Sequence, residues 1–154
     1  MKKIIAYLVL WLIAIVFLMV WQNFVELPEW YLKNLLLAQS TLIGIMGGIT
    51  YCLRAVYINK CVKKKWETEW ETWYYLRPIT SAVSGFASFV FLKAGLLVLD
   101  AATKPDQISY GYLAIAFIAG YNVDNFMKKL EEVASSIWGI KKSRASQDIE
   151  NSDN

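Results

Sequence analysis

The stretch RAVYINKCVKKKWETEWETWYYLRP, from Arg54 to Pro78, is the only long polar segment between the apolar blocks of the chain. The blocks cover residues 4–21, 35–53, 79–99 and 108–126. Each is close to the ~20 residues that a helix needs to cross a bilayer core of ~30 Å. We therefore predict an all-α membrane protein with four transmembrane helices in a single domain over residues 1–140. A helical extension reaches residue 139, and the polar tail 141–154 is predicted to be disordered.

The composition supports this class and argues against an enzyme. Of the 154 residues, 56% are apolar and 15% aromatic, against about 45 to 50% apolar in an ordinary soluble domain. No segment outside the blocks exceeds about 35 residues, which is too short for an independent soluble core. The chain has no histidine, the commonest proton shuttle and metal ligand near neutral pH. We expect no enzymatic activity, no cofactor and no metal.

The distribution of basic residues predicts the orientation. With the N-terminus inside, thirteen of the sixteen Lys and Arg residues fall on inner segments: two before the first block, six from Arg54 to Arg77, and five after Tyr121. The positive-inside rule then predicts both termini in the cytoplasm, in a multi-pass protein of the plasma membrane.

Small residues recur at helical spacing in the second and third blocks. They are Ser40, Gly44 and Gly48 in the second, and Ser81, Ser84, Gly85 and Ser88 in the third. Such stripes allow two helix backbones to approach closely in lipid. Two interpretations remain open: the stripes pack within one protomer, or they line a pore in an oligomer.

The polar segment predicts contacts with the membrane surface. No Gly or Pro interrupts it before Lys65, so the helix of the second block is expected to continue past Leu53. Anionic headgroups are the expected partners of its lysines, and nucleic acid is not. Indole rings at helical spacing predict an amphipathic interfacial helix within residues 60–75, or alternatively a partner-binding helix. The lysines are Lys60, Lys63, Lys64 and Lys65, and the indoles are those of Trp66, Trp70 and Trp73. Pro78 is placed in the first turn of the third span.

Several polar residues lie at or near membrane depth. Lys93 lies inside the third span, and it either has a function or extends toward the interface near Asp100. Asn122 and Asp124 require partners there, because unpaired polar groups are costly in lipid. We predict that Asp124 forms an ion pair with Arg77 or Arg54, as a structural clamp, with a role in proton transport as the alternative.

A seam of apolar residues follows the last block. Its spacing alternates between three and four residues, which is typical of a helix that packs against another helix. The seam consists of Val123, Phe126, Leu130, Val133 and Ile137. We predict a cytosolic helix continuous with the fourth span.

Two short motifs carry a resemblance to a known group of proteins. Tyr75-Leu76-Arg77-Pro78 and Ala119-Gly120-Tyr121-Asn122, with Gly85 and Gly95 between them, resemble a pattern in small uncharacterised multi-pass proteins of the bacterial inner membrane. The resemblance covers the C-terminal half. It implies a bacterial plasma membrane and no particular activity.

Two functions are compatible with these features. The first is a homo-oligomeric pore or membrane-perturbing effector built from the small-residue stripes. The second is a membrane-anchored sensor or scaffold, for example in a defence or stress system, that binds a cytosolic partner through the 60–75 helix and the 123–137 seam. The sequence slightly favours the first.

Overall fold

The computed structural model describes residues 2–64, 66, 68–96 and 105–139, and this part of the chain is helical with no strand. The first part of the chain forms three α-helices, α1 (Lys2–Trp21), α2 (Glu29–Lys33) and α3 (Leu35–Tyr57). Helix α3 is followed directly by the π-helical turn η1 (Ile58–Val62). The remainder consists of the 3₁₀ turn η2 (Thr68–Trp70), α4 (Glu71–Lys93), α5 (Pro105–Tyr121) and α6 (Val123–Trp138).

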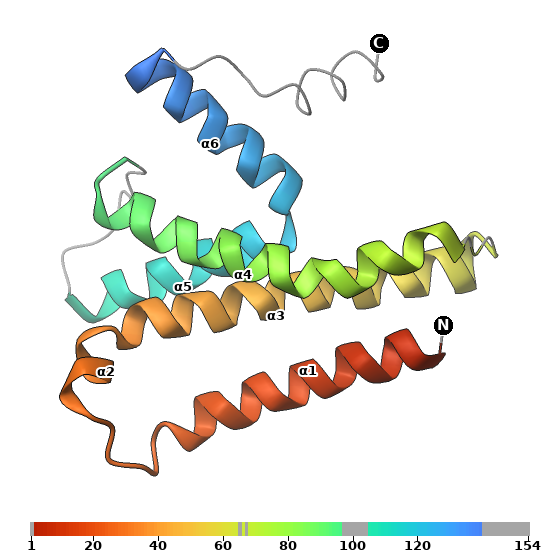
Figure 1. Ribbon diagram of the computed structural model, residues 1–154, viewed down its shortest axis with the longest axis horizontal. Coiled ribbons are helices and arrows are strands. Elements are labelled where there is room, and N and C mark those ends of the chain that lie inside the picture. Colours follow the sequence, from red (N-terminus) through yellow and green to blue (C-terminus); the bar gives the residue numbers. More distant parts are fainter. Residues whose placement is uncertain (1, 65, 67, 97–104, 140–154) are drawn as a thin grey trace.

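Helix α3 lies at the centre of the bundle (Figure 1). It packs along α4 and α5, and α1 runs along another side of it. Helix α6 leaves the bundle at the end of α5 and points away from the other helices.

Three helical segments are long and apolar enough to cross a membrane: Lys2–Trp21, Leu35–Val62 and Glu71–Lys93. Helix α5 is shorter, with 17 residues, and at 1.5 Å per residue it is about 26 Å long. The apolar part that qualifies is only Tyr110–Tyr121. The fourth predicted span is thus shorter than the range 108–126.

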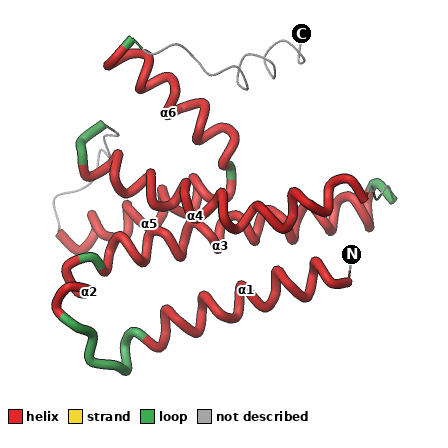
Figure 2. Tube along the Cα trace, in the orientation of Figure 1, coloured by secondary structure: helices red, strands yellow, loops and turns green. Residues whose placement is uncertain are grey.

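The predicted continuous helix through residues 108–137 is wrong, because the chain breaks at Asn122. Asn122 has φ −124° and ψ 60°, outside the helical region, and its carbonyl accepts the first hydrogen bond of α6 from Phe126 N at 3.0 Å. Asn is among the residues that favour this position just before a helix. The break turns α6 away from α5 (Figure 2).

The third helix also begins earlier than predicted. Helix α4 starts at Glu71 and contains Pro78 in its interior, so Pro78 does not occupy a first turn. An internal proline loses one backbone hydrogen bond and costs about 3 kcal/mol, but Pro78 is fully buried and the aromatic residues before it are held by packing. The predicted separate interfacial helix within residues 60–75 is therefore not formed. Residues 97–99 of the predicted span lie outside the described residues, as does the tail 141–154.

The second helix does extend past Leu53, as predicted. It runs to Tyr57 and continues through η1 to Val62. Lys64 then adopts a positive φ of 51°, which ends the helical path.

The main apolar core joins α1 and α3. It contains Ile4, Leu8 and Ile15 of α1, which lie against Ile49 and Cys52 of α3. The outward face of α1 is apolar and open, with Leu10 and Ile13 exposed at 69% and 64%. Apolar surface of this extent is expected to face lipid.

Candidate functional site

Small residues bring α3 and α4 into backbone contact. A Cβ placed on Gly44 would lie 2.7 Å from the Cα of Gly85 and 2.8 Å from the carbonyl oxygen of Ser81. Ser40, Ser81, Ser84 and Ser88 are all fully buried, and a Cβ on Gly48 would overlap the Ser81 hydroxyl. Both predicted stripes thus face helices of the same chain.

Helix α5 completes this crossing through a glycine that sequence reasoning did not place. A Cβ on Gly120 would overlap the carbonyl of Gly44, and one on Gly47 would overlap the carbonyl of Phe117. The Ser81 hydroxyl donates a hydrogen bond to the carbonyl of Gly120 at 3.0 Å. The available signal was the pair of adjacent glycines, Gly47 and Gly48, which gives α3 one glycine facing α5 and one facing α4.

Arg77 lies at the end of this crossing that is next to the break at Asn122 and is almost fully buried, with 3% of its side chain exposed. Its Nη1 donates to Asp124 Oδ2 at 3.3 Å, and its Nη2 donates to the carbonyl of Tyr121 at 3.2 Å. Of the two arginines predicted as partners of Asp124, the structure pairs Arg77. Asp124 itself is 69% exposed, so its carboxylate lies on the solvent side of the buried guanidinium.

Two aromatic rings enclose the guanidinium of Arg77. Its Cζ lies 4.8 Å from the centre of the Tyr51 ring and 4.9 Å from that of Trp73. Cation–π contacts of this kind are worth about 0.5 to 2 kcal/mol each, with the larger values at desolvated sites. The planar guanidinium suits this position between two rings, and an ammonium group does not.

The second arginine, Arg54, also binds Tyr121, at the side-chain hydroxyl instead of the backbone carbonyl. Arg54 is exposed, and its Nη1 donates to the Tyr121 hydroxyl at 2.6 Å. The Tyr121 ring also contacts Tyr51 edge to face, with ring centres 5.4 Å apart. Arg54 and Arg77 therefore both bind the last residue of α5, directly before the break at Asn122.

The three predicted headgroup-facing tryptophans do not share one exposed face. Trp66 stacks on Tyr74 with ring centres 5.6 Å apart, and Trp73 contacts Tyr51 and Arg77. Only Trp70 is largely exposed, at 56%. The prediction failed because the first turns of α4 pack against α3. Lys60, Lys63 and Lys64 are exposed, and Lys65 lies outside the described residues.

Lys93 ends α4 on the opposite side of the bundle. It is exposed, and its Nζ lies 5.5 Å from the centre of the Phe89 ring. Asp100, the carboxylate toward which it was expected to extend, lies outside the described residues.

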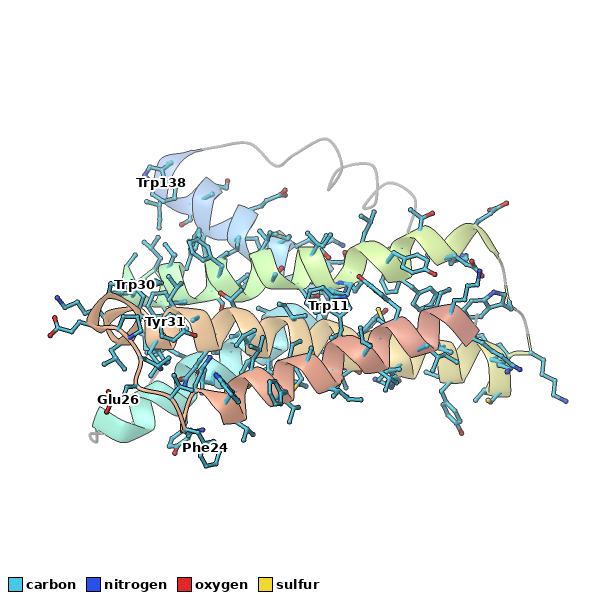
Figure 3. The ribbon with its side chains drawn as sticks, turned by 60° about the horizontal axis from the view of Figure 1, so that its bottom comes forward. Trp11, Phe24, Glu26, Trp30, Tyr31 and Trp138 are labelled. Carbon is cyan, nitrogen blue, oxygen red and sulfur yellow. The ribbon has the colours of Figure 1, made fainter. Side chains whose placement is uncertain are left out.

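Exposed aromatic residues also lie in and before α2. Figure 3 shows Phe24, Trp30 and Tyr31 near α2, where Phe24 and Trp30 are exposed at 80% and 68%. Aromatic rings of this kind are typical of a membrane interface.

The predicted seam lies on α6 and is only partly covered. Val123 is buried next to the clamp, and Phe126, Leu130 and Val133 are half-buried. Ile137 and Trp138 are exposed at 49% and 59%, and Trp138 is at the end of α6 remote from its first turn (Figure 3). On the polar side, the carboxylate of Glu132 accepts a hydrogen bond from Lys129 at 2.8 Å and raises the pKa of that lysine.

The fold and these contacts define a helical protein with three potential membrane-spanning segments and a buried arginine clamp at the root of an amphipathic helix. Comparisons with known protein families, with curated proteins and with solved structures gave no match.

Proposed function

We propose that this chain is a non-enzymatic integral protein of the bacterial plasma membrane that anchors α6 as a binding helix for another protein helix. The proposal keeps the four-helix topology with both termini in the cytoplasm. The observation that carries it is that α6 is held at its first turn by Arg77 and exposes apolar side chains, Ile137 and Trp138, at its other end.

The charges of α6 favour a helical partner over lipid headgroups. Its polar side carries two lysines and three acidic residues, whereas helices that lie on anionic membranes are rich in basic residues. Mixed charges flanking an apolar seam are typical of helix pairs. The homo-oligomer expected from the sequence is the simplest form of such a pairing, and a cytosolic partner is the other.

The clamp gives α6 a defined starting direction. Arg77 binds Asp124 in the first turn of α6 and the carbonyl of Tyr121 at the end of α5. It therefore fixes both sides of the break at Asn122. A partner that binds α6 would be coupled to the bundle through this arginine, as expected of a sensor or scaffold.

The pore interpretation has less support from these contacts. Gly44, Ser81 and Gly85 contact neighbouring helices of the same chain, so they are not free to line a path between protomers.

Site-specific photocrosslinking tests the proposal. We expect a photoreactive residue at Ile137 to give a discrete protein adduct in membranes, because Ile137 lies on the exposed apolar face. The matched control is Ser135, which is exposed on the polar side of the same turn. The mass of the adduct distinguishes a second copy from another protein.

Equal yields at the two positions, or adducts with lipid alone, would contradict the proposal. Depolarisation of cells that express a variant lacking residues 123–154 would favour the pore instead, because α6 would then be dispensable for activity.

A further inference from the structure

A cavity of about 340 Å³ lies beside the inner end of α3, within the usual size range of ligand pockets. Its lining residues are Tyr51, Arg54, Ala55, Ile58, Asn59 and Lys63. Two of them are cationic and none is acidic. The cavity adjoins the Arg77 site and shares Tyr51 with it, because the Tyr51 ring lines the cavity and also lies 4.8 Å from Cζ of Arg77, which is not among the lining residues.

The π-helical turn is what brings the two cations to one cavity. Arg54 and Lys63 are nine residues apart, which in a regular α-helix places them about 180° apart around the axis. In η1 the amide of Lys63 instead bonds the carbonyl of Ile58, five residues earlier, at 2.9 Å. The wider turn rotates Lys63 back toward the face of Arg54. Single π turns of this kind occur frequently at functional sites.

The donors around the cavity suit a phosphate group. Arg54 uses one nitrogen to bind the Tyr121 hydroxyl, and its guanidinium has five N–H donors in all. Lys63 is exposed, and among the described residues its side-chain ammonium has no hydrogen bond or ion pair. Arginine recognises phosphate with two parallel hydrogen bonds, and lysine adds a point charge.

We propose that this cavity, between the last turns of α3 and η1, binds the phosphate of an anionic ligand through Arg54 and Lys63. Ala55 and Ile58 provide an apolar side next to the cations. A phospholipid therefore matches the lining, with its phosphate at the two cations and an apolar part at Ala55 and Ile58. A soluble phosphate ester carries the same anionic group. The proposal is independent of what binds α6.

Native mass spectrometry of the delipidated protein in a neutral detergent tests the site, because no bilayer is present to attract lysines in general. Phosphatidylglycerol is titrated, with phosphatidylcholine as the zwitterionic comparison. We expect the double variant R54Q/K63Q to bind the first phosphatidylglycerol about thirtyfold more weakly. The control K60Q/K64Q removes two exposed lysines that do not line the cavity, and we expect a change of less than about twofold.

The single variant K63Q removes no side-chain contact with a described residue, so a loss of binding in it cannot be ascribed to misfolding. We expect K63Q to weaken binding about fivefold. Competition by inorganic phosphate or glycerol 3-phosphate would support the same site with a soluble source. Equal losses in the two double variants, or equal binding of the two lipids by the unmodified protein, would overturn the proposal.

Discussion

The Arg77→Gln variant separates the contributions of the partners that surround the buried guanidinium. The two ring contacts contribute about 1 to 2 kcal/mol each. The charge-assisted hydrogen bond to the carbonyl of Tyr121 adds about 1.5 to 3 kcal/mol. Glutamine no longer buries a charge, which offsets part of this loss. We expect the free energy of unfolding to fall by about 3 kcal/mol for this variant.

The matched change on the other side of the ion pair is Asp124→Asn. Because Asp124 is 69% exposed, its charge is screened by solvent, and exposed ion pairs contribute about 0 to 1 kcal/mol. Asparagine also keeps an oxygen that accepts from Nη1. We expect a loss of less than about 1 kcal/mol.

Reversible unfolding in mixed micelles, followed by far-ultraviolet circular dichroism, measures both values. Arg77→Lys is a useful third variant, since it keeps the charge and loses the planar group; we expect it to behave like Arg77→Gln. The reasoning is refuted if Asp124→Asn costs as much as Arg77→Gln, because the carboxylate would then be the main partner of the arginine.

Three further predictions concern packing and topology. Gly120→Ala should lower the free energy of unfolding by about 1 to 3 kcal/mol, because its Cβ meets the backbone of Gly44; Ala114→Val, at an exposed position of α5, should change it by less than about 0.5 kcal/mol. Ser81→Ala should cost about 0.6 to 1.5 kcal/mol through loss of its bond to α5, and Ser84→Ala should cost less, since that hydroxyl bonds Thr80 of its own helix; equal losses would contradict this assignment. A membrane-impermeant maleimide should label the exposed Cys61 in inverted vesicles and not in intact cells, while the buried Cys52 should stay unlabelled in both. Labelling of Cys61 in intact cells would reverse the proposed orientation.

The sequence was sufficient where a single helix decided the outcome. Apolar length predicted α1 and α3, and the absence of Gly and Pro after Leu53 predicted the extension of α3. The small-residue spacing around Gly44 in the second block and Gly85 in the third identified residues of the contact between α3 and α4, although pore lining stayed open as an alternative, and it did not identify the closer approach of Gly120 on α5. The pairing of Asp124 with an arginine followed from the cost of an isolated polar group in lipid.

The predictions that were wrong, for the start of α4 and for a continuous helix through Asn122, share a different cause, which is packing between segments distant in the chain. Pro78 normally ends or begins a helix, yet the contacts of Trp66 and Trp73 with neighbouring rings extend α4 on its N-terminal side. Two arginines, Arg54 and Arg77, bind Tyr121 directly before the break at Asn122, and neither lies close to the break in sequence. Local periodicity cannot reveal such contacts.

The short α5 has a consequence for the lipid around the protein. In the four-span topology that we propose, we expect a bilayer whose hydrocarbon is ~30 Å thick to thin locally beside α5, which is about 26 Å long, and each ångström of mismatch costs a fraction of a kcal/mol. The longer helices α1, α3 and α4 impose no such deformation, so the strained lipid annulus lies on one side of the molecule. We propose that two copies with their α5 sides together would share that annulus, so that the bilayer itself would favour their association.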